Sequence, residues 1–222
     1  MVKPSKIIKS RRKNISLMID KQGDLIIKAP TFVTNRELYD LVERKQDWVL
    51  KKQREVLEQV KARQFSLVEG AKLMFQGEDV TIHIGDFPKI RIKEGQLYLP
   101  SNPKTERMER ALCDWMKQQA AYLIEESLSH YSDVIGVEYE EYKLSNARTR
   151  WGTCNSNHIL RFSWRLVMCP QDILDYVVVH ELCHIGCMNH SKAFWERVGR
   201  ALPDYKQRRK WLRTHQAIMD FM

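Results

Sequence analysis

Residues 176–184 read YVVVHELCH, an apolar run that leads into an HExxH pattern. The run predicts a buried helix, which Pro170 begins. Residues four apart on a helix differ by about 40° in direction, so His180 and His184 project from adjacent turns of one face. Glu181 lies about 100° from His180, near the imidazoles without being forced to coordinate. The pattern predicts two histidine ligands for a metal ion, with Glu181 as the general base that acts on a metal-bound water.

The segment after this helix is expected to supply the third ligand. Gly186 can end the helix and reverse the chain, because glycine adopts the left-handed conformation without strain. His190 follows, between Asn189 and Ser191, either of which can cap a new helix. Three imidazoles leave the fourth position of a tetrahedral ion open to water, and in a cell they favour zinc. We therefore predict one Zn²⁺ per chain, held by these three histidines.

A cysteine is the competing third ligand. If the helix continued past Gly186, Cys187 would lie seven residues from His180 on the same face, and a thiolate binds zinc well. Gly186 argues against that continuation, so Cys183 and Cys187 are interpreted as small buried side chains. The other four histidines lack ligand spacing: His83, His130, His158 and His215.

The N-terminal part is predicted to be a hairpin covered by a helix. Residues 14–20 and 24–29 are β-rich runs separated by a turn that contains a glycine. Thr34 and Glu37 have the spacing of a capping box, and apolar residues follow at helical spacing to about Ala62. The apolar face of this helix should pack on the hairpin.

A domain boundary is expected at Pro100 and Pro103. Glycines punctuate short strands between residues 72 and 99, and the two prolines then interrupt any continuing ladder. We therefore divide the chain into an N-terminal α+β lobe, residues 1–100, and a second domain, residues 101–222.

The second domain is predicted to begin with a long helix over residues 104–131. Strand-like runs follow at residues 138–144, 159–162 and 165–168, before the helix that Pro170 begins. The predicted fold class is therefore α+β.

The composition excludes several classes of protein. The 222 residues are 43% hydrophobic with only 9 Gly and 7 Pro, so the chain can form a core and is neither disordered nor collagen-like. No apolar run approaches the roughly 20 residues of a membrane helix, and no secretory signal is visible. The 5 cysteines, at irregular spacing, do not suit a disulfide framework. We expect a cytoplasmic protein with no membrane partner.

Several further motifs carry a family resemblance. They are RWGTC at 150–154, WRL at 164–166, NHS at 189–191, FW at 194–195 and PDYK at 203–206. With the HExxH helix, they make the chain resemble the YgjP-like metallopeptidase family, which belongs to the zincins and has SprT-type proteases as relatives. The resemblance spans most of the chain.

The resemblance implies a zincin-like metallopeptidase domain at residues 101–222. By similarity, His180, His184 and His190 are zinc ligands and Glu181 is the catalytic general base. The implied activity is zinc-dependent hydrolysis of peptide bonds, with a peptide or protein as substrate. The resemblance identifies neither the natural substrate nor the oligomeric state.

Other functions stay open as alternatives. A non-peptide amide hydrolase would use the same site. The net charge of +9 suggests a DNA-associated protein, or a protease of the SprT type acting on nucleic-acid-bound proteins. The basic clusters, such as residues 206–210, are nevertheless scattered and typical of solvated faces. A purely structural zinc would need a fourth ligand from Cys183 or Cys187.

Two details of the site are predicted only as sets of candidates. Arg150, Tyr205 and His215 are candidate donors to the oxyanion. The strand at 159–162 is expected to offer a free edge to an extended peptide if it lies beside the HExxH helix. Trp151 and Gly152 are interpreted as core packing followed by a turn.

Overall fold

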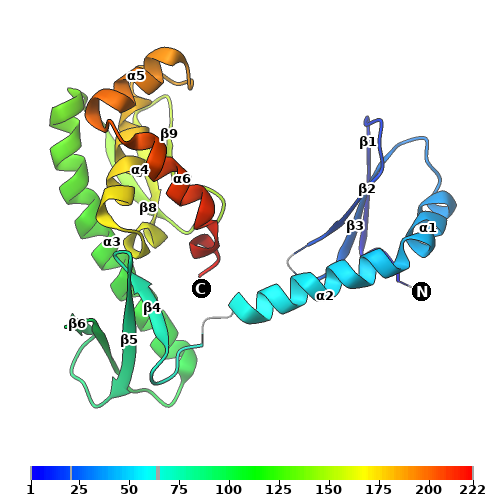
Figure 1. Ribbon diagram of the computed structural model, residues 1–222, viewed down its shortest axis with the longest axis horizontal. Coiled ribbons are helices and arrows are strands. Elements are labelled where there is room, and N and C mark those ends of the chain that lie inside the picture. The colour runs from blue at the N-terminus through cyan, green and yellow to red at the C-terminus, as the bar shows by residue number, and fades with distance from the viewer. Residues whose placement is uncertain (1, 21, 64–65, 222) are drawn as a thin grey trace. The chain divides into compact units, whose positions relative to one another are not determined.

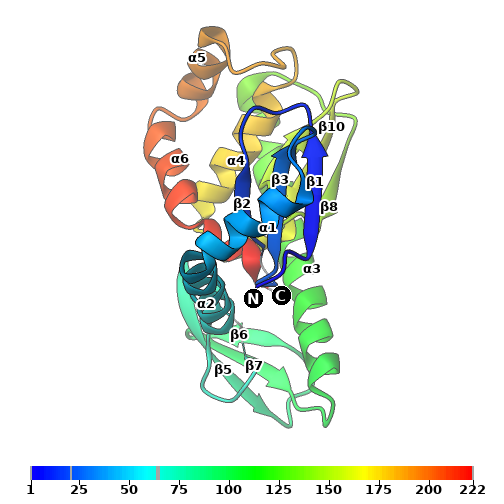
Figure 2. The ribbon, with the colours of Figure 1, turned by 90° about the vertical axis from the view of Figure 1, so that its right-hand side faces the viewer.

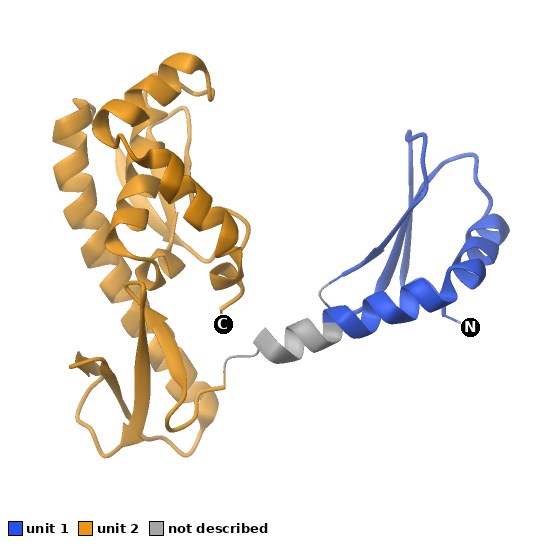
Figure 3. Cartoon of the chain, in the orientation of Figure 1, with its two compact units in different colours: residues 1–64 blue, residues 65–222 orange. Residues whose placement is uncertain are grey.

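The computed structural model describes residues 2–20, 22–63 and 66–221. It confirms the α+β class, with helices and three small sheets (Figures 1 and 2). The chain divides into two compact units, residues 1–64 and residues 65–222, coloured separately in Figure 3. Within the described residues, no helix combines the length and the apolar character needed to cross a membrane.

The first unit is built on a three-stranded sheet. The strands are β1 (Lys6–Ser10), β2 (Ser16–Ile19) and β3 (Leu25–Pro30), in the order β1-β3-β2. The antiparallel pairing of β2 with β3 confirms the predicted hairpin. β1 pairs in parallel with β3 and had not been predicted, because its sequence KIIKS has two adjacent isoleucines between polar residues and so lacks the alternation of a half-buried strand.

Two helices cover this sheet where one was expected. They are α1 (Asn35–Arg44) and α2 (Gln46–Arg63), and they meet at Lys45, which leaves helical geometry with ψ 14°. No proline or glycine lies at this break, and the helical spacing of the apolar residues therefore predicted one continuous helix. The capping box is confirmed, since the Glu37 backbone N–H donates to the Thr34 hydroxyl and the Glu37 carboxylate accepts from the Thr34 backbone. The apolar face packs on the sheet as predicted, with Leu38, Val42 and Val49 beside Leu25, Ile27 and Ala29.

The second unit begins with a four-stranded sheet. Its strands are β4 (Lys72–Phe75), β5 (Glu78–Gly85), β6 (Arg91–Lys93) and β7 (Gln96–Pro100), in the order β4-β5-β7-β6. The expected boundary between residues 1–100 and 101–222 is therefore misplaced. Leu97 and Leu99 belong to the same core as Leu112 and Met116 of α3 (Thr105–Ile135), so this sheet joins the helix that follows it.

The turn between β4 and β5 fixes this sheet to the rest of the unit. The backbone N–H of Gln76 donates to the carbonyl of Val167 at 2.8 Å, and that of Gly77 donates to Met168 at 2.9 Å. Gly77 has a φ of 83°, and a Cβ there would lie 2.6 Å from Cγ of Pro170. Glycine is therefore required both by the backbone angle and by the close approach of Pro170.

We expect Gly77→Ala to destabilise the second unit by about 2–4 kcal/mol, the sum of left-handed strain and a steric clash. The matched control is Gly95→Ala, because Gly95 has a similar φ of 71° with nothing within 4 Å of its Cβ position. This control should cost only about 1–2 kcal/mol. Urea denaturation measures both, and equal losses would show that contact with Pro170 adds nothing.

A three-stranded sheet follows α3. Its strands are β8 (Glu141–Ser145), β9 (Gly152–Cys154) and β10 (Ile159–Ser163), in the order β8-β10-β9. β10 lies in the centre, parallel to β8 and antiparallel to β9. The expected free edge at residues 159–162 is therefore wrong, because both edges of β10 are paired.

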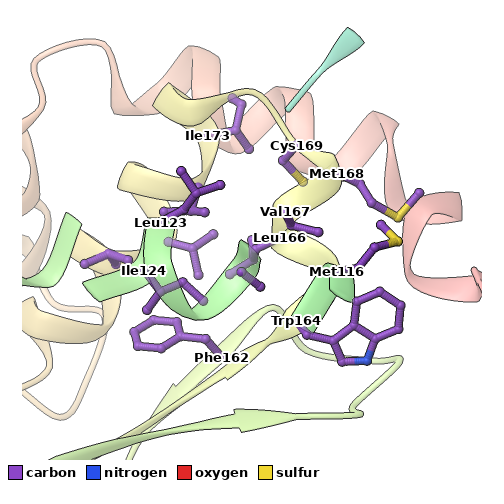
Figure 4. Packing of buried hydrophobic residues seen from close by; sticks show 14 of the residues in the cluster. Met116, Leu123, Ile124, Phe162, Trp164, Leu166, Val167, Met168, Cys169 and Ile173 are labelled. Carbon is purple, nitrogen blue, oxygen red and sulfur yellow. The ribbon is translucent and has the colours of Figure 1, made fainter. Parts of the chain in front are cut away.

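The predicted strand at residues 165–168 is also wrong. Residues Trp164–Met168 form the 3₁₀ helix η1, and all five are buried. An apolar run buried on every side has no periodicity that separates a strand from a short helix. The run packs against α3 in the main core of the unit, where Figure 4 shows Leu166 and Val167 near Leu123 and Ile124.

The remaining elements are helical. They are α4 (Gln171–Cys183), α5 (Lys192–Ala201), α6 (Tyr205–Thr214) and the 3₁₀ helix η2 (Gln216–Asp220). α4 begins directly after Pro170, as predicted, and packs against α3, α5 and α6. This packing on several sides explains why α4 is apolar nearly all round. It also makes α4 a rigid element for the HExxH residues.

Candidate metal centre

The end of α4 sets the directions of the candidate ligands. The helix ends at Cys183, His184 is its C-cap residue, and Gly186 then takes a φ of 87°. The helix therefore ends three residues before Gly186, and the chain reverses through the left-handed turn at Gly186, as its glycine predicts. α5 begins after Ser191, whose hydroxyl accepts from the Phe194 backbone N–H at 3.4 Å, so Ser191 is the cap and His190 directly precedes it.

The reversal brings three imidazoles together. One ring nitrogen from each of His180, His184 and His190 lies within 4.8 Å of the others, and Nε2 of His180 is 3.1 Å from Nε2 of His190. Two nitrogens that share a tetrahedral zinc ion lie roughly 3.3 Å apart, as Zn–N bonds of about 2.05 Å require. The spacing fits an ion bound between these rings.

Hydrogen bonding and burial favour the ligand form of these rings. Nδ1 of His184 lies 3.1 Å from the backbone oxygen of Cys187, which suits an Nδ1–H donor and leaves Nε2 as a lone-pair donor. Burial lowers the pKa of His180 to about 3 and also lowers the pKa of His184. Neutral imidazoles are the form that binds metal.

Aromatic side chains support the cluster. Phe194 lies edge-on to His180, with ring centroids 5.0 Å apart, and Trp195 stacks on His190 at 5.6 Å. Tyr205 in turn stacks on Trp195 at 5.3 Å. Nδ1 of His180 is buried and has no hydrogen-bond partner among the described residues, so packing orients this ring.

The thiol of Cys187 lies outside the histidine cluster. Its Sγ is 3.5 Å from the hydroxyl of Ser191 and 3.6 Å from the backbone oxygen of Asn189. Cys187 contributes its backbone carbonyl, which contacts His184. Cys183 is fully buried as expected, whereas Cys187 is half-buried.

Glu181 is a buried carboxyl group with an exposed fraction of 5%. Burial raises the pKa of Glu181 to about 8, and a hydrogen bond from the backbone of Cys154 opposes that rise. A divalent cation at the histidines would favour the carboxylate and lower the pKa of Glu181. A group with these opposing influences is suited to taking up and releasing a proton near neutral pH.

Gly152 makes room for this carboxyl group. A Cβ on Gly152 would lie 2.7 Å from Cγ and 2.8 Å from Oε1 of Glu181. The interpretation of Gly152 as a turn residue missed this role, because the contact joins β9 to α4 across 29 positions of sequence. No local pattern in the sequence indicates that Gly152 and Glu181 come into contact.

His180 and Glu181 also line a cavity of about 600 Å³. Its other walls come from β9 and the residues before it, from α4, and from α6. Arg150 lines this cavity, whereas Tyr205 stacks on Trp195 and His215 stacks on Trp211 with ring centroids 3.9 Å apart. Of the three candidate oxyanion donors, the structure therefore brings Arg150 to the cavity.

Three imidazoles around one point, with a carboxyl group beside them in a cavity, are typical of metal-dependent hydrolases. Comparison with protein families agrees with this class. The YgjP-like metallopeptidase domain model matches residues 13–215, and the chain belongs to this family. It is thus a hydrolase of the metallopeptidase class, and membership implies a divalent metal ion.

A solved structure gives a weaker likeness. The metallopeptidase zymogen abylysin of Pyrococcus abyssi aligns with a TM-score of 0.39 and 18% sequence identity, over 41% of this chain and 93% of that one. Comparison with curated proteins gives no match.

Proposed function

We propose that this chain is a zinc-dependent metallopeptidase that hydrolyses peptide bonds, with His180, His184 and His190 as ligands and Glu181 as general base. The observation that carries the proposal is the convergence of three ring nitrogens beside a buried carboxyl group, where His180 and Glu181 line one cavity. A set of three nitrogen donors supports zinc, one ion per chain. The proposal includes a reducing, cytoplasmic setting, which the odd number and irregular spacing of the 5 cysteines support.

Zinc bound there would supply a Lewis acid that lowers the pKa of a water molecule and polarises the peptide carbonyl. Glu181 takes the proton from the attacking water and then gives it to the leaving amine. Gly152 keeps the space that the Glu181 side chain occupies. Arg150, from the cavity wall, is the candidate donor to the oxyanion.

The edge of β9 is the proposed contact for the substrate backbone. β9 pairs with β10 on one side, and its other edge pairs with no strand among the described residues. The backbone N–H of Cys154 faces this edge and donates to Glu181, so an extended peptide added there would run past the general base. Backbone pairing of this kind tolerates many side chains.

The test is digestion of an unfolded protein by the purified chain, read by mass spectrometry of the products. Cleavage should stop when a chelator removes the metal and return when one equivalent of zinc is added. Cleavage that continues at the same rate in the metal-free protein would refute the proposal.

A further inference from the structure

One wall of the cavity is strongly basic. Four cationic residues of α6 line it at positions i, i+3, i+4 and i+7, which is one face of a helix, and Arg150 lines it from the loop before β9. We call these five residues the basic wall: Arg150, Lys206, Arg209, Lys210 and Arg213. Glu181 is the one acidic residue among those that line the cavity.

The basic wall lacks the counter-charges that usually accompany such a helix face. Within the described part of the chain, no member forms an ion pair, and all five are exposed. The neighbouring Arg208 differs, because its guanidinium contacts the Asp204 carboxylate at 2.9 Å and donates to the Asp172 backbone oxygen. Arg208 therefore holds α6 in place, whereas the wall presents cations to the cavity.

The wall reaches the histidine cluster through one aromatic side chain. The guanidinium of Arg209 lies over the ring of Trp195, 4.8 Å from its centroid, and Trp195 stacks on His190. An anionic group held by the wall would therefore lie close to the proposed reaction centre. Unpaired cations that repel one another in a partly enclosed site favour an anionic ligand.

The dimensions favour a peptide over a nucleic acid duplex. The four α6 residues span seven helical steps, roughly 10 Å, which is the length of about three residues of an extended peptide. A volume of about 600 Å³ holds a short peptide segment, whereas a whole nucleic acid duplex is too wide to be enclosed by a cavity of this size.

We propose that the basic wall selects peptides that carry acidic side chains beside the scissile bond. The inference rests on the proposed peptidase function and names its substrate class. Each carboxylate that pairs with an exposed cation adds a factor of about two to five in affinity, so two or three acidic residues give clear discrimination. The preference should weaken with rising salt.

Binding tests this inference separately from catalysis. The probe is a ten-residue peptide of alternating acidic and small residues, with fluorescein on its N-terminal amine and an amidated C-terminus, and its comparator has Asn and Gln in place of Asp and Glu. Fluorescence anisotropy with the zinc-loaded Glu181→Gln chain should give roughly 4- to 100-fold tighter binding of the acidic peptide at low salt.

Charge-reversal pairs locate the binding. Lys210→Glu/Arg213→Glu should weaken binding of the acidic peptide by at least roughly ten-fold. The control pair is Arg107→Glu/Arg110→Glu, on exposed positions of α3 that do not line the cavity. It changes the net charge by the same amount, at the same spacing along a helix. It should change binding less than two-fold, because salt screens charges that lie far from the bound peptide.

Three results would overturn the inference: equal binding of the neutral peptide, equal losses from the two charge-reversal pairs, or displacement of the acidic peptide by duplex DNA at lower concentration. Failure of the peptidase proposal looks different. In that case the acidic peptide still binds, and the wild-type chain cleaves no peptide.

Discussion

Glu181→Gln is expected to lower the rate of peptide hydrolysis by roughly 100- to 10,000-fold while zinc stays bound, because glutamine cannot accept the proton of the attacking water. The variant should fold normally. Glutamine matches the shape of the protonated carboxyl group, and burial of Glu181 favours that neutral form in the absence of metal. The measurements are kcat on a peptide from the digestion assay and zinc content by mass spectrometry.

Gly152→Ala tests the role of Glu181 as general base by moving its side chain instead of replacing it. The added methyl group must displace the Glu181 side chain, which is expected to cost roughly 100-fold in kcat through misplacement of the base. Gly199→Ala in α5 is the control, because a Cβ there lies at an ordinary contact distance of 3.5 Å from Tyr205.

Wild-type turnover by Glu181→Gln would remove Glu181 from the mechanism. Normal activity of Gly152→Ala would show that the carboxyl group does not need its present position.

Local geometry explains which parts of the site the sequence predicted. The directions of His180 and His184 follow from helix geometry alone. A glycine at position 186 predicts the left-handed turn that follows the helix. The capping box at Thr34 and the hairpin of β2 and β3 are equally local. In each case, residues only a few positions apart determine the structure.

Tertiary packing explains what the sequence did not predict. The Gly77 turn docks on Pro170 across 93 positions, which moves the boundary from residue 100 to residue 64. The basic residues at 206–210 read as a solvated face, because nothing local shows that α6 packs on α4 and turns Lys206 and Arg209 toward the cavity. Contacts of this kind become visible only when distant elements are brought together.

His190→Ala is expected to reduce zinc from about one ion per chain to a small fraction, because two helical imidazoles alone make a weak site. Cys187→Ala should keep the zinc. Its Sγ contacts Ser191 and the backbone of Asn189, and the interaction of Cys187 with His184 is made by a backbone oxygen that alanine also has. Mass spectrometry of the untagged proteins measures the metal content of both variants.

The two variants distinguish the competing ligand sets. Zinc lost with His190 and kept without Cys187 supports an open site, in which three histidines leave one coordination position for water and substrate. Zinc kept without His190 but lost without Cys187 would make the thiolate the third ligand. α4 ends at Cys183, and after the turn at Gly186 the chain brings Nε2 of His190 to 3.1 Å from Nε2 of His180, so the fold favours the first result.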